Sequence, residues 1–379
     1  QLAKDNEFAR YRRLETFQSG AAISPNGKYV GGFVPSIAPD DSWQYSPTII
    51  DMETGDVYEF GPYPESLILP TSVSCVTSQG LMYVVNGQGD MFAFDMHERN
   101  YFIPEVAGYA TIQVNSSSAD GTKWVGRATG KGETMYVPLI SENGTVRELP
   151  MTELNYRNEP HSMGIIARGI SADGSIAYGT IWDNLDFGMV YWKDWQNGGQ
   201  AEYVGKGVHV RKVEKALDSQ GLEYDYYCAD GMICQANRTK ISPSGKWIAG
   251  SYRTWTLAEN RMDAVTSQVA AFYDVETETT VIVDEYGEST GTHVTDDGIG
   301  FIGLGSLGIS SGRVYDCNTR TDLGTTQEWV YDNYGIIIPN CYVTSISPDG
   351  TVVFGRYLES SAGGHMKFPG WYVAPPVAE

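Results

Sequence analysis

The sequence predicts an all-β fold, a seven-bladed β-propeller, and three observations support this prediction. Residues that favour strands and turns are plentiful, because the 379-residue chain has 43 Gly, 25 Tyr and 9 Trp but only 19% charged residues. A short hairpin motif recurs seven times. Most motifs are spaced by roughly the 40 to 50 residues of one four-stranded propeller blade. We therefore expect residues 1–379 to form a single propeller domain.

The repeated motif is an apolar strand followed by a tight turn that ends in Gly. In five of the seven turns Asp or Asn precedes this Gly, and such pairs supply the positive φ that hairpin turns need. Successive turn glycines are separated by 53, 41, 53, 71, 53 and 52 residues; they are Gly27, Gly80, Gly121, Gly174, Gly245, Gly298 and Gly350. Each motif therefore predicts the first two strands of a blade.

The remaining strands of each blade follow from the segments between motifs. The second strands are rich in β-branched and aromatic residues and most end in Gly, as in Trp124–Gly126 and Val353–Gly355. Between motifs there is room for two further strands, such as Pro47–Asp51 and Val57–Phe60 in the first blade. The prediction is seven blades of four antiparallel strands.

The two ends of the chain are expected to meet in the last blade. Trp371–Val373 has the character of a third strand, which leaves the seventh blade without an outer strand. Arg13–Phe17 resembles the outer strands Val57–Phe60 and Val146–Leu149. We expect the N-terminal strand to complete the blade, because closure removes an exposed sheet edge.

The 71-residue spacing marks an insertion, residues 205–237, between blades four and five. A short helix is expected around residues 213–219. Cys228 and Cys234 are close enough in sequence to form a local disulfide. The insertion is either a lid or docking element over the loops, or a decoration without a ligand. Cys75 is expected to be a buried thiol, and the pairing of Cys317 with Cys341 is left open.

The turn sequences, such as Ile346-Ser347-Pro348-Asp349-Gly350-Thr351, resemble the WD40-like repeats of TolB-family propellers and the short repeats of other exported bacterial propellers. The resemblance covers all seven hairpins, about six residues in each. It implies a propeller fold and an extracytoplasmic location, which is periplasmic, cell-surface or secreted. The start at Gln1, without Met or an apolar signal core, agrees with a mature exported chain.

Composition argues against several functions. The net charge of −21 repels nucleic acid and anionic lipid, and no apolar run reaches the roughly 20 residues of a membrane span. Residues 303–308 match a dinucleotide fingerprint but precede a strand instead of a helix, so no cofactor is expected. The Cys and His spacing predicts no metal site. The oligomeric state is left open.

The long loops between second and third strands should gather on one face, around the channel mouth, where propeller ligands bind. They carry aromatic residues beside charged ones, a combination that suits glycans and protein partners alike. The candidate ligand-binding residues are Trp43, Tyr45, Trp182, Asp183, Asp186, Arg253, Trp255 and Glu259. Two further candidates, Lys240 and His293, lie on inner strands of adjacent blades, at a position that is otherwise mostly small.

Three functions compete. The first is a non-catalytic binding or adhesion scaffold that recognises a glycan or a protein on this face. The second is a glycan-cleaving enzyme, a glycoside hydrolase or lyase, which would use a carboxylate pair taken from Asp40, Asp41, Asp183, Asp186 and Glu259. The third is a structural platform for protein interactions, with a flat apolar face. Because no complete catalytic motif is present, the sequence favours binding.

Overall fold

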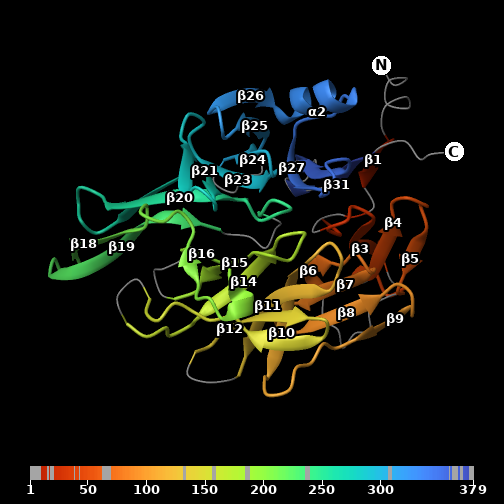
Figure 1. Cartoon of the computed structure of the whole chain (residues 1–379), viewed down its shortest axis with the longest axis horizontal. Coiled ribbons are helices and arrows are strands. Elements are labelled where there is room, and N and C mark those ends of the chain that lie inside the picture. Colours follow the sequence, from red (N-terminus) through yellow and green to blue (C-terminus); the bar gives the residue numbers. More distant parts are fainter. Residues whose placement is uncertain are drawn as a thin grey trace.

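The computed structural model describes residues 10–14, 17, 21–37, 39–41, 43–61, 70–130, 134–155, 159–183, 188–234, 240–305, 310–357, 359–360, 366–367 and 370–374. These residues form seven antiparallel blades of four or five strands, and a separate two-stranded hairpin. Consecutive blades pack against one another in a ring (Figure 1). The chain is a β-propeller, as predicted.

Blades one to four, each given from the inner to the outer strand, are β2 (Ala22–Ile23), β3 (Tyr29–Ile37), β4 (Trp43–Asp51) and β5 (Val57–Glu59); β6 (Pro70–Val76), β7 (Leu81–Asn86), β8 (Met91–Asp95) and β9 (Asn100–Phe102); β10 (Thr111–Ser117), β11 (Lys123–Thr129), β12 (Val137–Glu142) and β13 (Thr145–Glu148); and β14 (Ile165–Ile170), β15 (Ala177–Ile181), β16 (Met189–Trp192) and β17 (Glu202–Tyr203).

The other blades follow the same order. Blade five holds β18 (Val210–Leu217), β19 (Glu223–Ile233), β20 (Trp247–Leu257), β21 (Ala264–Asp274) and β22 (Thr279–Val283). Blade six holds β23 (Ser289–Val294), β24 (Ile299–Leu304), β25 (Gly312–Asp316) and β26 (Thr321–Thr325). Blade seven holds β27 (Cys341–Ile346), β28 (Val353–Tyr357), β31 (Gly370–Ala374) and β1 (Arg10–Leu14). The separate hairpin is β29 (Glu359–Ser360) with β30 (Met366–Lys367).

The predicted hairpin turns are present in every blade. All seven turn glycines have positive φ, between 70° and 84°. In blade three, Ser118 Oγ donates to Asp120 Oδ1 at 2.6 Å, and the same carboxylate accepts the Thr122 N–H at 3.0 Å. Asp173 and Asp349 make the same contacts in their turns. The recurring Ser-x-Asp-Gly sequence is therefore a hydrogen-bonded turn.

A β-bulge interrupts the inner strand at one shared position, six residues before the turn Gly. It occurs in five blades, and the bulge residues are Ser74, Asn115, Arg168, Thr292 and Thr344. All five side chains are polar. In two blades they bind the next inner strand, since Ser74 Oγ donates to the Val114 carbonyl at 2.5 Å and Asn115 Nδ2 to the Ala167 carbonyl at 2.7 Å. Such bonds satisfy carbonyls that face the channel.

The glycine that ends many second strands also has a physical reason. A Cβ on Gly126 would lie 1.8 Å from the Gln113 carbonyl oxygen, and one on Gly355 would lie 2.3 Å from that of Tyr342. Both carbonyls stand just before a bulge in the inner strand. Only Gly permits so close an approach of the two strands.

The N-terminal strand closes the ring as predicted. Strand β1 pairs with β31 from Arg10 opposite Ala374 to Leu14 opposite Gly370, three residues earlier than the sequence indicated. Leu14 and Phe17 are fully buried between blades seven and one, against Phe354. Figure 1 shows β1 beside β31 in this blade.

The insertion contains a hairpin, β18–β19, and the helix predicted around residues 213–219 was wrong. Val213 pairs with Tyr227 and Ala216 with Tyr224, so a partner strand rich in Tyr overrides local helix propensity. The hairpin lies along the extended ends of β20 and β21 and projects from the propeller (Figure 1). We call this projection, residues 210–230 and 254–268, the arm.

Blade five also departs from the predicted inner strand. Gly231–Ile233 of β19 pairs with Ser251–Arg253, and Ile241 forms a separate bridge with Ile248. Cys228 and Cys234 are both buried thiols, so the expected disulfide is absent from the structure. Cys75, Cys317 and Cys341 are likewise buried thiols.

One α-helix is present within the described ranges, α2 (Thr326–Tyr334), between blades six and seven. Thr325 and Glu328 form a capping box at its start. Neither this nine-residue helix nor any other described helical segment has the length and apolar character needed to span a membrane.

Candidate ligand-binding site

The predicted loop residues fall into separate groups. Asp186 and the side chain of Trp43 lie outside the described residues. Tyr45 on β4 is half-buried and packs against the apolar cluster that contains Tyr29 and Phe33. It therefore stabilises blade one. Trp182 and Asp183 follow β15 in blade four, whereas Arg253, Trp255 and Glu259 belong to β20 and the tip of the arm.

Asp183 is buried and already bound by protein groups. One carboxylate oxygen lies 2.6 Å from Nδ1 of His161, and the other accepts the N–H groups of Met163 at 2.8 Å and Gly164 at 3.2 Å. Burial alone would raise the pKa of this carboxyl, but the bonds from His161, Met163 and Gly164 outweigh it and lower the pKa. Asp183 is a structural residue that fixes the segment before β14.

This segment positions two aromatic side chains. The Tyr136 N–H donates to the Met163 carbonyl at 2.7 Å, and the Trp182 N–H donates to the Gly164 carbonyl at 2.8 Å. Gly164 has φ of 95°, and a Cβ there would lie 2.0 Å from the Tyr136 carbonyl oxygen. The close approach therefore requires Gly.

Two arginines stack on these aromatic rings. Arg127, at the end of β11, lies 4.4 Å from the ring centroid of Tyr136, and Arg168, the bulge residue of β14, lies 5.7 Å from that of Trp182. Burial lowers the pKa of both guanidinium groups, and the positive charge of Arg127 lowers the pKa of Arg168 further. The guanidinium groups of Arg127 and Arg168, which come from neighbouring blades, are therefore both largely buried.

The arm carries a third stack. Arg253 lies 4.9 Å from the ring centroid of Trp255, whose own ring is 6.3 Å from that of Tyr226. The Trp255 N–H donates to Asp230 at 2.8 Å, which ties the two hairpins of the arm together. Glu259 is exposed at the tip. These contacts hold the arm together and do not join Trp255 to Trp182.

Lys240 directly precedes the Ile241 bridge of blade five, and His293 lies on β23 of blade six. Lys240 is buried, and its Nζ donates to the Gly291 carbonyl at 2.5 Å. His293 is buried with its ring 6.3 Å from that of Phe301. Lys240 therefore links blade five to blade six in the way that Ser74 and Asn115 link other blades.

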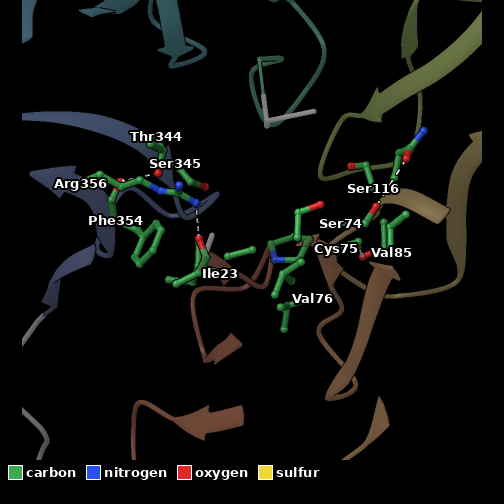
Figure 2. A pocket seen from close by; sticks show the side chains of 17 residues that line it. Ile23, Ser74, Cys75, Val76, Val85, Ser116, Thr344, Ser345, Phe354 and Arg356 are labelled. Carbon is green, nitrogen blue, oxygen red and sulfur yellow. Dashed lines mark hydrogen bonds between the residues drawn. The ribbon is translucent and has the colours of Figure 1, made fainter. Parts of the chain in front are cut away.

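A cavity of ≈ 310 Å³ opens among the inner strands of blades seven, one, two and three. Figure 2 shows Arg356, Thr344 and Ser345 on one side, and Ser74 and Ser116 on the opposite side. Its polar wall consists of Ser72, Ser74, Asn115, Ser116, Ser117, Thr344, Ser345 and Arg356. None of the described residues that line it is Asp or Glu. The cavity therefore offers hydroxyl, amide and guanidinium groups to a ligand.

Arg356 brings positive charge to this cavity. It lies on β28 directly after Gly355, as Arg127 follows Gly126 on β11, and it donates to the Ala21 carbonyl of blade one. Asn115, on the other side, binds the carbonyl of Ala167, which precedes Arg168. A hydrogen bond therefore joins the inner strands of blades three and four beside the cavity.

Sequence reasoning missed Arg127, Arg168, Arg356 and Asn115. A signal was available: when the seven motifs are aligned on the turn Gly, Arg168 is a charged residue at a position where the other described blades carry Ala21, Ser74, Asn115, Thr292 and Thr344. The two Gly-Arg pairs at the ends of β11 and β28 are a second signal. The prediction relied on the aromatic and charged residues of the loops and did not consider these strand positions.

Comparison with known proteins finds similarity among solved structures. No protein-family model matches the chain, and no curated protein matches it in sequence. Among solved structures, it is similar to an oligogalacturonate lyase from Vibrio parahaemolyticus (11% identity, 97% of this chain and 91% of that chain, TM-score 0.48). It is also similar to the β-propeller domain of the Trilobed protease from Pyrococcus furiosus (10%, 97% and 94%, 0.48) and to TolB from Acinetobacter baumannii (12%, 79% and 63%, 0.37). These proteins resemble the chain in fold alone.

Proposed function

We propose that this chain is a non-catalytic, extracytoplasmic binding scaffold that recognises a glycan in and around its central channel. The observation that carries the proposal is the ≈ 310 Å³ cavity, whose wall presents hydroxyl, amide and guanidinium groups beside apolar side chains such as Ile23, Val73 and Phe354. Sugars present many hydroxyl groups, which pair with Ser, Thr and Asn side chains. The volume falls at the lower end of the range typical for small-molecule sites. The TolB-like repeats support the extracytoplasmic part of the proposal.

A concave site with a mixed polar and apolar wall argues against the flat interaction platform. A platform needs a large, continuous apolar surface. Several exposed apolar side chains lie on the arm. They include Val213, Leu222, Met262 and Val265. They are remote in sequence from the strands that form the cavity. A protein partner for the arm remains a second candidate function, favoured by this exposed group.

The glycan-cleaving alternative requires two carboxylates that face a substrate, one of them with a raised pKa. Of the acids considered for that role, Asp183 is buried, bound by three protein groups, and has a lowered pKa. Glu259 stands exposed at the tip of the arm. Neither arrangement supports acid catalysis, so binding is the function we propose.

A glycan array probed with the purified chain tests the proposal. Ser345→Leu fills the cavity from blade seven, and Trp182→Ala removes the aromatic ring that stacks on Arg168 in blade four. Tyr101→Ala, at an exposed outer strand, is the control. We expect selective binding that both site variants reduce at least tenfold and the control leaves unchanged. Absence of glycan binding, or binding that Ser345→Leu does not change, would overturn the proposal.

A further inference from the structure

Strand β9, the outer strand of blade two, differs from the other outer strands of the propeller in composition and exposure (Figure 1). Five of the six others carry a charged residue, as β5 carries Glu59 and β26 carries Asp322. The sixth, β22, has no charge but buries Val281 and Val283. All three residues of β9, Asn100–Phe102, are exposed and none is charged. Charged residues commonly protect a sheet edge from pairing with another chain, and β9 lacks this protection.

Three consecutive apolar residues are exposed at this edge. Tyr101 is 47% accessible, Phe102 43% and Ile103 58%. Single exposed apolar side chains are ordinary, but a continuous exposed run usually serves an interaction. The ring centroid of Tyr101 lies 6.3 Å from that of Phe92 and 5.8 Å from that of Phe94, both on β8. The run therefore belongs to an ordered strand that packs on its blade.

A groove of ≈ 720 Å³ adjoins this run, at the junction of blades two and three. Its wall consists of the start of β8, the connection that leads from β9 to β10, and the start of β10. Apolar residues form much of this wall, and among them are Met91, Phe92, Ile103, Pro104, Val106 and Ile112. The volume lies within the range of ordinary ligand pockets, so the groove has room for side chains of a partner.

The wall of the groove is fixed by contacts within the chain. The Tyr109 N–H donates to the Val106 carbonyl at 3.2 Å, and the Ala110 N–H donates to the Thr129 carbonyl at 2.9 Å. The Tyr109 hydroxyl donates to Glu148, on the outer strand of blade three, at 2.5 Å. Val106 and Tyr109 also pack against an apolar cluster of blade three. A ligand therefore binds here with little reordering of the connection.

The charges around the groove are acidic. Asp90 and Glu105 line it and are exposed, whereas none of the described lining residues is Lys or Arg. Glu98, in the turn before β9, is a third exposed acid. Arg99, the cation next to β9 in the sequence, stacks on blade one, because it lies 5.6 Å from the centroid of the Tyr58 ring. The complement of this surface is a ligand that combines apolar side chains with positive charge.

Other occupants fit this surface less well. A second copy of the chain would bring the same acids to the groove and a net charge of −21, so like charges would meet. The same charge opposes binding to an anionic lipid surface. An extended segment of another protein can pair its backbone with the edge of β9 and place alternate side chains in the groove.

We propose that β9 and the adjoining groove form a docking site for an extended segment of a partner protein in which apolar residues alternate with Lys or Arg. The segment lies along β9. Its apolar side chains contact Phe102 and Ile103 and enter the groove, and its cationic side chains face Asp90 and Glu105. The groove shares no lining residue with the channel cavity, so this inference does not rest on the glycan proposal.

Selection of random linear peptides displayed on phage, with the purified full chain as bait, tests the inference. Enriched peptides are synthesised and titrated by calorimetry. The site variants are Phe102→Ser, Ile103→Ser and Glu105→Lys. Their matched controls are Ile282→Ser, on the other uncharged outer strand, and Glu159→Lys, at an exposed acid outside the groove. Thermal melting of each variant checks that it is folded.

We expect the enriched peptides to combine aromatic or aliphatic residues with Lys or Arg. Phe102→Ser and Ile103→Ser should weaken their binding at least tenfold, because each removes apolar contact area. Glu105→Lys should weaken it at least threefold, because it replaces an attractive charge with a repulsive one. Both controls and the channel variant Ser345→Leu should leave peptide binding unchanged.

Several results would overturn the inference. Enrichment of peptides without Lys or Arg, or peptide binding that Phe102→Ser does not weaken, rules out the docking site described here. Sedimentation of the chain alone as a dimer that Ile103→Ser dissociates would assign the edge to a second copy. Binding to phosphatidylcholine vesicles that Phe102→Ser abolishes would assign it to a membrane. Failure to enrich any peptide also overturns the inference, and it leaves the glycan proposal standing.

Discussion

Two pairs of ionisable side chains lie within a few residues of each other at the junction of blades three and four, and they are built in opposite ways. His161 and Asp183 form a pair of complementary groups whose oxygens are all engaged, by His161, Met163 and Gly164. Arg127 and Arg168 carry the same charge, and what holds them is the face of an aromatic ring.

The two pairs therefore contribute differently to the stability of the fold. A pair that satisfies itself stabilises the fold and has nothing left to offer a ligand. The charges of Arg127 and Arg168 oppose each other, and each guanidinium is held over the face of an aromatic ring. The two are connected, because Asp183 holds Met163 and Gly164, whose carbonyls accept from Tyr136 and Trp182. The His161–Asp183 pair therefore positions the aromatic rings on which Arg127 and Arg168 stack.

The largest effect on the free energy of unfolding is expected from removal of the His161–Asp183 pair. Asp183→Ala leaves His161 and two buried N–H groups without their acceptor, so the free energy of unfolding should fall by about 3 kcal/mol or more. Urea unfolding followed by tryptophan fluorescence measures it. A loss under about 1 kcal/mol would mean that the pair is not the support described above.

The same pair gives the next effect, a pH dependence. The pKa of Asp183 is lower in the folded chain than its ordinary value of 3.8, so the unfolded chain binds the proton more readily. Its stabilising contribution is present above pH 3.8 and is lost as the pH falls from 3.8 through the folded-state value. Urea unfolding across this range should show a smaller pH dependence for Asp183→Asn than for the wild type. Identical profiles would contradict the assignment.

Whether a feature could be predicted from the sequence depends on how far apart in the chain the contacting residues stand. Turn residues act on their own hairpin, so Asp120-Gly121 and its six relatives predicted every blade. The closing strand was predictable because only one segment remained for one open edge. The Tyr-rich strand β19 pairs over a distance that propensity cannot see, so the segment around Val213 was misjudged.

The site itself was harder to predict for the same reason. Arg127 and Arg168 stand 41 residues apart, on strands whose side chains meet only when blade three packs on blade four. Trp182 was identified correctly as a residue of the loop, but its partner was not, since nothing local to Trp182 indicates Arg168. Asp183 was expected to face a ligand because it stands beside the aromatic Trp182 in a long loop. In the structure its carboxylate instead accepts hydrogen bonds from the backbone N–H groups of Met163 and Gly164.

A smaller effect is expected at the arginine that has its own carboxylate. Asp322→Asn removes the charge that pairs with Arg313, and the pair is partly exposed, with side chains 26% and 37% accessible. Such pairs contribute about 0.5 to 1 kcal/mol, so the variant should be slightly less stable than the wild type in the same urea assay. A gain in stability would place Arg313 in the same class as Arg127.

The smallest effect on stability is expected from Arg127→Gln, a change in the Arg127–Arg168 pair. Gln keeps a polar side chain but relieves the repulsion on Arg168, so the free energy of unfolding should stay within about 0.5 kcal/mol of the wild type or rise. The urea assay used above measures this free energy for the wild type, for Arg127→Gln and for the control Arg147→Gln. A loss of 2 kcal/mol in Arg127→Gln would instead show that the arginine pair supports the fold, and that its like charges are compensated by the protein itself.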